Sequence, residues 1–295
     1  MERLTAKDFH PEVMHWFDKY VHGIVDRRGF LSGVSKYAVG GMTATAMLEA
    51  LSPNFAQAQQ VAKNDPRIKT KVVEYASPSG SGKMSGLLAW PANAAGKLPG
   101  ILVIHENRGL NPHIEDIARR LAVDGFLAFA PDALFPMGGY PGDEDKAREM
   151  FAKLDQAKTR ADFIAAAGYL KGLPECTGKI GVVGFCYGGG IANMLATQLP
   201  DLGGAVPFYG GQPSAEDAAK IKAPLLIHYA SNDERINAGW PAYENALKAA
   251  GVKYEVFVYT GTEHGFNNDT TPRYNKAAAD VAWQRTVAFF KKNLA

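Results

Sequence analysis

The chain has 295 residues, of which 46% are hydrophobic and 21% charged, and its formal net charge is +2. This composition is typical of a globular protein with a sizeable core, in one large domain or two small ones. The small net charge and the lack of a basic patch interleaved with aromatics exclude a nucleic-acid-binding protein, and no apolar run suffices for an integral membrane span. There is no Walker-type phosphate loop, and we expect no cofactor.

Residues 1–58 differ in character from the rest of the chain. A polar stretch is followed by the motif DRRGFLS at residues 26–32, a moderately apolar stretch at 34–51, and Ala-Gln-Ala at 56–58. This order resembles a twin-arginine export signal with a cleavage site, so we predict a periplasmic protein. The leader before the arginines is long, and two charged residues interrupt the apolar stretch. The alternative is a cytoplasmic protein with a folded N-terminal helical arm.

Residues 59–295 indicate one domain in which strands alternate with helices. The predicted strands are 71–76, 87–91, 100–105, 126–130, 180–185, 204–209, 224–229 and 254–259. The predicted helices are 114–122, 143–154, 161–170, 189–199, 241–249 and 276–292. Most strands are continuous apolar runs, which predicts an α/β fold: a mostly parallel, doubly wound sheet with helices on both faces. Functional residues are then expected at the carboxyl ends of the strands.

Cys186 follows the predicted strand 180–185 and has glycines two positions before and after it, at Gly184 and Gly188. This is the spacing of the α/β-hydrolase nucleophile elbow, G-x-S-x-G, with cysteine in place of serine. The chain must turn sharply from strand to helix, and glycines allow the close backbone approach. The N-terminus of the following helix favours a thiolate. A buried structural cysteine in a glycine-rich turn is the alternative reading.

A thiol nucleophile needs a base, and the base needs an orienting partner. In α/β-hydrolases the order along the chain is nucleophile, acid and histidine. Asp233 and His264 follow Cys186 in that order, each at the end of a predicted strand, with Asp269 and Asp280 as rival carboxylates. We therefore predict a triad of Cys186, Asp233 and His264.

The other histidines lack such positions, and we predict structural roles for them. They are His10, His15 and His22 in the N-terminal segment, and His113 and His228 in the domain. We also predict no metal site, because the His105–Glu106 pair is followed by glycine where a zincin requires its second histidine.

Several short motifs resemble those of the dienelactone hydrolase (carboxymethylenebutenolidase) family. They are HENRG at 105–109, APD at 130–132, GFCYGG at 184–189, the turn at Asp233, and EHGF at 263–266. The resemblance runs from about residue 68 to the C-terminus and is greatest to a subgroup with an N-terminal extension. It implies an α/β-hydrolase fold and a Cys-His-Asp hydrolase of lactone or carboxylic-ester bonds that forms a thioester acyl-enzyme.

The resemblance also implies roles for residues around the nucleophile. Glu106 matches the family glutamate that contacts the resting thiol and takes part in its activation. The backbone N–H groups of Tyr187 and Asn107 match the oxyanion hole. A reactive thiol in an oxidising compartment is at risk of oxidation, so we expect Cys186 to stay buried and protonated until substrate arrives.

The sequence departs from the family at the substrate-binding arginines. Family members that act on dienelactone hold its carboxylate with two arginines, where this chain has residues 134–137 and Asn268. Arg108 or Arg273 could replace them from elsewhere. The substrate is expected to be a small-molecule ester or lactone, and the sequence does not identify which one. Two further hypotheses are a non-hydrolytic electrophile-binding or thiol-sensing protein and, with less support, a peptidase-like relative. We expect a monomer or a small homo-oligomer.

Overall fold

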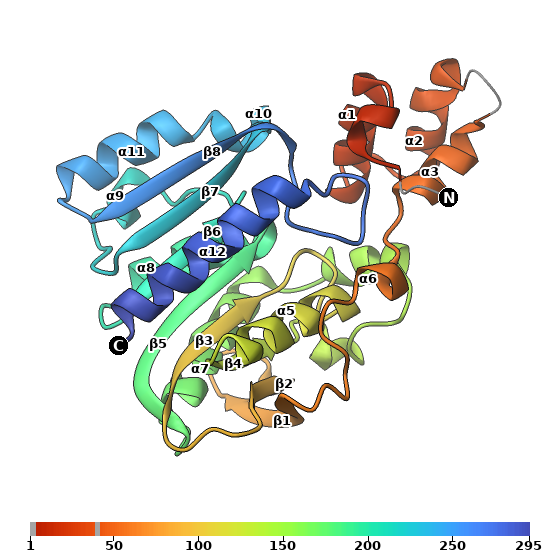
Figure 1. Cartoon of the computed structure of the whole chain (residues 1–295). Coiled ribbons are helices and arrows are strands. Elements are labelled where there is room, and N and C mark those ends of the chain that lie inside the picture. Colours follow the sequence, from red (N-terminus) through yellow and green to blue (C-terminus); the bar gives the residue numbers. More distant parts are fainter. Residues whose placement is uncertain (1–3, 39–41) are drawn as a thin grey trace.

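An eight-stranded sheet forms the centre of the protein, in a computed structural model that describes residues 4–38 and 42–295 (Figure 1). Its strands are β1 (Ile68–Ser77), β2 (Gly82–Pro91), β3 (Leu98–Ile104), β4 (Leu127–Pro131), β5 (Cys176–Phe185), β6 (Gly204–Phe208), β7 (Leu225–Asn232) and β8 (Tyr254–Glu263). The spatial order is β1-β2-β4-β3-β5-β6-β7-β8. The β1–β2 and β2–β4 pairs are antiparallel and all the others are parallel.

Helices cover both faces of this sheet, as the apolar runs predicted. The helices of the domain are α5 (Pro112–Val123), α6 (Glu144–Phe151), α7 (Gln156–Gly172), α8 (Tyr187–Gln198), α9 (Ala215–Ala218), α10 (Glu234–Asn237), α11 (Trp240–Ala249) and α12 (Lys276–Asn293). One apolar core lies between the sheet and α5 and α12, and the other lies under α7, α8 and α11 (Figure 1). The prediction of an α/β-hydrolase fold is confirmed, and every predicted strand and helix of the domain is present.

The junction of β5 and α8 is the sharp turn that the glycine spacing predicts. Cys186 has φ 55° and ψ −113°, a strained backbone conformation for a residue with a side chain. A Cβ atom at Gly184 would collide with the carbonyl of Gly188, and one at Gly188 with the carbonyl of Ile104. The two glycines therefore allow the ends of β3 and β5 and the start of α8 to approach closely. This approach places Cys186 at the carboxyl end of the sheet.

The N-terminal segment forms a helical unit with its own apolar core. Its helices are α1 (Pro11–Val21), α2 (Arg27–Val34), α3 (Ala44–Leu51) and α4 (Phe55–Ala58). Phe17, Phe30 and Leu48 are among the buried side chains that hold α1, α2 and α3 together, and α4 lies against α5. Arg27 and Arg28 are exposed at the start of α2. This is the architecture of the helical-arm alternative, and export through a twin-arginine signal stays a prediction. In the described part of the chain, no helix has the length and apolar character to span a membrane.

The close contact at Gly184 can be tested by substitution. We expect Gly184→Ala to lower the free energy of unfolding by about 1–3 kcal/mol or more, because its methyl group meets fixed backbone. The control is Gly190→Ala on the same elbow helix, where the nearest neighbouring atom to the new methyl would be 3.6 Å away. Thermal and urea unfolding measure both variants. Equal stability of the two would contradict the close approach.

Candidate active site

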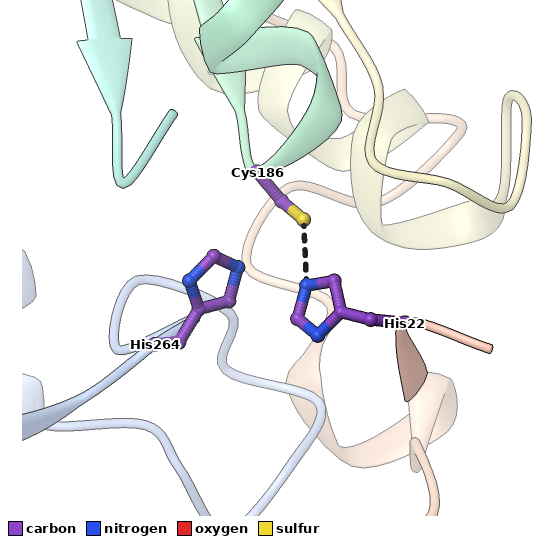
Figure 2. Close-up of side chains that lie close together, drawn as sticks. All are labelled: His22, Cys186 and His264. Carbon is purple, nitrogen blue, oxygen red and sulfur yellow. Dashed lines mark hydrogen bonds between the residues drawn. The ribbon is translucent and has the colours of Figure 1, made fainter. Parts of the chain in front are cut away.

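Cys186, Asp233 and His264 meet at the carboxyl ends of three strands, although they are far apart in the sequence. Cys186 follows β5, Asp233 follows β7 and His264 follows β8. His264 Nδ1 lies 2.5 Å from Asp233 Oδ2, so the carboxylate orients the imidazole. His264 Nε2 has no hydrogen-bond partner in the described part of the chain, and the ring lies beside the thiol (Figure 2). The three predicted triad residues are thus neighbours.

The rival carboxylates have other partners. Asp269 binds Arg120 and lies 3.3 Å from His113, and Asp280 pairs with Lys276 on the surface. His228 is buried between Tyr259 and Thr286 and does not face the thiol. These residues stabilise the fold around the site.

A second histidine, which sequence reasoning assigned a structural role, lies directly against the nucleophile. His22 Nε2 is 3.3 Å from Cys186 Sγ (Figure 2). Its Nδ1 lies 2.8 Å from the backbone oxygen of Asp18 and 3.1 Å from Oδ1 of the same residue. The i,i+4 spacing of Asp18 and His22 was a signal of local pairing. No local pattern could indicate that this pair reaches a cysteine 164 residues away.

The end of α1 is held at the site by side chains of the α/β domain. The last carbonyls of a helix lack intrahelical donors and must find other partners. Arg148 Nη1 donates to the carbonyl of Tyr20 at 2.8 Å. Asn107 Nδ2 and Arg108 Nη2 donate to the carbonyl of Val21 at 2.8 and 3.1 Å. These bonds fix the residue that follows, which is His22.

The charges around Cys186 favour a thiolate. Burial raises the pKa of the thiol, but the charges of His264 and His22 and the hydrogen bond from His22 outweigh it and hold that pKa at about 5. Burial lowers the pKa of His264, but the Cys186 charge and the Asp233 hydrogen bond raise it to about 10. The geometry therefore supports a thiolate–imidazolium pair, in contrast to the protonated thiol expected from the sequence.

The turn after β3 carries the predicted Glu106 and Asn107. His105 braces it, because His105 Nε2 accepts from the N–H of Ala133 at 3.1 Å. Glu106 Oε2 accepts from Asn268 Nδ2 at 2.9 Å, so the glutamate is paired with a residue that stands where the family has an arginine. Glu106 and His22 line the same small cavity as Cys186, so a role for Glu106 in activating the thiol stays a prediction.

The two predicted oxyanion-hole donors are the backbone N–H groups of Tyr187 and Asn107. Tyr187 is the first residue of α8, so its N–H is one of the helix's free initial donors. Asn107 and Tyr187 both line the cavity that contains Cys186. Their location agrees with a role at the carbonyl that the sulfur attacks.

The two candidate substrate-binding arginines differ in their availability. Arg108 donates to two backbone carbonyls and lies 3.6 Å from Glu144, so it belongs to the docking surface of α1. Arg273 is buried with its guanidinium over the Phe17 ring, and its Nε and Nη1 have no acceptor in the described part of the chain. Arg273 shares a small cavity of about 30 Å³ with Cys186 and His264.

A larger cavity of about 1070 Å³ opens in front of the sulfur. Its polar end is formed by Cys186, His264 and His22, and its walls are largely apolar. The apolar lining includes Phe151, Ile164, Ile191 and Met194. This volume suits a small organic molecule with one polar reacting group.

Cys186, His22 and His264 also offer a thiol and two imidazoles within 4.8 Å of one another, which is a zinc ligand set. Arg235 Nη2 lies 3.0 Å from His22 Nε2. Its fixed positive charge therefore stands at the ligand atom that a cation would need. The arrangement fits thiolate–imidazole chemistry better than metal binding.

The comparisons with known sequences agree with this geometry. The model of the dienelactone hydrolase family matches residues 84–294, and a model described as YqhI-like matches residues 1–39. A "Putative hydrolase fragment YghX" of Escherichia coli is 51% identical over 39% of this chain and 97% of its own. A "Putative carboxymethylenebutenolidase" of Saccharolobus solfataricus is 34% identical, over 72% of this chain and 96% of its own.

Solved structures give the same result. A "Putative Dienelactone Hydrolase" from Klebsiella pneumoniae has a TM-score of 0.67 at 30% identity and covers 76% of this chain and 99% of its own. A dienelactone hydrolase-like promiscuous phosphotriesterase from metagenomic libraries has a TM-score of 0.66 at 26% identity, over 78% of this chain and all of its own. With the fold, the family match and these relatives in agreement, the chain belongs to the dienelactone hydrolase family.

Proposed function

We propose that the protein is a cysteine-dependent hydrolase of lactone or carboxylic-ester bonds. The observation that carries this proposal is the arrangement at the elbow. Cys186 stands in strained backbone at the mouth of a large cavity, beside a histidine whose far nitrogen is held by Asp233 at 2.5 Å. This is the nucleophile–base–orienter arrangement of covalent acyl transfer.

The proposed reaction begins with attack of the Cys186 thiolate on the substrate carbonyl. The C–S bond forms, and the oxyanion is stabilised by the N–H groups of Tyr187 and Asn107. When the C–O bond breaks, the His264 imidazolium donates its proton to the leaving alkoxide. The resulting thioester is then attacked by water, which loses a proton to a base as the C–S bond breaks. The acid product leaves and the thiolate is regenerated.

Arg273 is the proposed anchor for a substrate carboxylate. A buried guanidinium with unpaired N–H groups is costly, and a carboxylate would satisfy it. Its cavity is shared with the reacting sulfur, so an anion there would lie close to the scissile bond. Relatives named as carboxymethylenebutenolidases suggest an unsaturated lactone acid as one member of this substrate class.

Replacement of the nucleophile tests the reaction class. We expect Cys186→Ala to lower turnover of a p-nitrophenyl ester on the order of a thousandfold or more, because the covalent step is lost. Cys176→Ala is the control, since Cys176 is the chain's other cysteine and is buried away from the elbow. Unchanged turnover in the Cys186 variant would contradict the proposal. Stoichiometric labelling without turnover on a broad ester and lactone panel would favour the electrophile-binding hypothesis instead.

The pH dependence of alkylation tests the charge pair. With the pKa of Cys186 at about 5 and that of His264 at about 10, iodoacetamide should react at a nearly constant rate between these values, and more slowly as the pH falls through about 5. In His264→Gln the thiol pKa should rise towards its ordinary value of about 8.5, so alkylation at pH 6 should slow by roughly tenfold or more. A wild-type rate that climbs only above pH 8 would show a protonated resting thiol.

Paired substrates test Arg273. For an ester that bears a carboxylate, we expect Arg273→Gln to raise KM by roughly tenfold or more, as the loss of a charge-assisted hydrogen bond implies. The KM for a neutral ester of the same size should stay the same, which controls for any loosening of the contact with Phe17. For the ester that bears a carboxylate, the KM of Arg273→Lys should lie between those of the wild-type protein and Arg273→Gln. An equal change for both esters would rule out a carboxylate anchor.

A further inference from the structure

The N-terminal segment brings to Cys186 an Asp–His pair that matches the one in the hydrolase domain. We propose that Asp18 and His22 form a second catalytic pair, in which His22 is the base that activates water for hydrolysis of the thioester. This inference rests on the proposed cysteine-dependent hydrolysis. It assigns a chemical role to a segment that lies outside the family match at residues 84–294.

The two pairs are similar in construction. His264 Nδ1 lies 2.5 Å from the carboxylate of Asp233. His22 Nδ1 lies 2.8 Å from the backbone oxygen of Asp18, and the carboxylate oxygen Oδ1 of the same residue lies 3.1 Å from it. In each, Nε2 is turned towards the same sulfur, and the ring centroids are 4.8 Å apart at an angle of 81° (Figure 2). A carboxylate that fixes the ring and its tautomer is what makes a histidine an effective base.

Arg235 favours the neutral form of His22 once the thioester has formed. In the resting site, burial lowers the pKa of His22, but the Cys186 charge and the hydrogen bonds to Asp18 and Cys186 outweigh it and raise that pKa. The two rings share the proton of the thiolate pair, because two imidazolium rings so close together would repel each other. Acylation removes the charge on the sulfur, and Nε2 without its proton can then accept from Arg235 Nη2, which lies 3.0 Å away and only donates hydrogen bonds. In the acyl-enzyme His22 is therefore a neutral base.

This division of protons suits a lactone in particular. When a lactone opens, the alkoxide takes the His264 proton but stays tethered to the acyl group, close to that ring. A second base on another side of the sulfur can deprotonate water without waiting for the alcohol to leave. The new C–O bond forms, the C–S bond breaks, and the proton taken by His22 returns to His264. The product is the hydroxy acid, and the resting charge pair is restored.

The packing of α1 holds His22 firmly enough for such a role. Its position depends on the hydrogen bonds from Arg148, Asn107 and Arg108 to the last carbonyls of α1. Tyr20 adds a hydrogen bond to Asp145, and Arg148 lies over the Tyr20 ring at 4.2 Å. The N-terminal segment is thereby a wall of the active site, and the active enzyme should retain it.

The test compares the acylation and deacylation steps in the full-length chain. With a p-nitrophenyl ester, the first release of p-nitrophenol reports acylation, and the steady state that follows reports deacylation. We expect His22→Gln to keep the burst but to slow the steady state on the order of a hundredfold, with acyl-Cys186 accumulating in intact-mass spectra. Asp18→Asn should show the same pattern with a smaller loss. The matched control is His15→Gln, an exposed histidine of the same helix, which should change neither phase.

Three outcomes would overturn this inference. Burst and steady state that slow by the same factor in His22→Gln would mean that the histidine only packs against or positions the thiol. No change in either phase would mean that it takes no part. A loss of activity accompanied by a lower melting temperature in His22→Gln, with normal deacylation in a stable Asp18→Asn, would show a structural role. Absence of any acyl-Cys186 adduct in the wild-type protein would overturn the proposed hydrolysis itself.

Discussion

The charge pair at Cys186 is the interaction on which the rest of the site depends. Removing a thiolate from water is costly, and the charges of the two imidazoles and the hydrogen bond from His22 oppose this cost and lower the pKa of the thiol. The elbow adds the free N–H groups at the start of α8, which favour negative charge at that point. Asp233 and Asp18 in turn orient the two imidazoles. The strained backbone at Cys186, the glycine contacts and the start of α8 thus all place the sulfur where positive charge surrounds it.

The N-terminal segment joins this arrangement through the unsatisfied end of a helix. The final carbonyls of α1 need donors, and the hydrolase domain supplies them from Asn107, Arg108 and Arg148. Two of these residues lie in the turn that also carries the expected oxyanion donor. The same turn therefore holds the helix and shapes the catalytic cavity.

The departures from the family pattern form a connected set. Asn268, at a position where the resemblance implies an arginine, binds Glu106, and His22 lies beside the sulfur in the cavity that Glu106 also lines. Arg273 comes from a different part of the same loop and presents a buried guanidinium to the small cavity behind the thiol. Cys186, Asp233 and His264 thus lie together as the motifs predict, while the groups around them come from other elements.

The sequence alone was sufficient for the fold and for the placement of Cys186, Asp233 and His264 at neighbouring strand ends, because both follow from local patterns. Continuous apolar runs predicted the buried parallel strands, the glycines at 184 and 188 predicted the elbow, and Cys186, Asp233 and His264 stood in the required order. The role of His22 could not be predicted in this way. Its position depends on how α1 docks onto a turn some 86 residues later in the chain and onto α6 beyond it, through contacts between a helix end and side chains of another unit. Such contacts leave no periodicity or spacing in the sequence, and they exist only once the two parts have packed together.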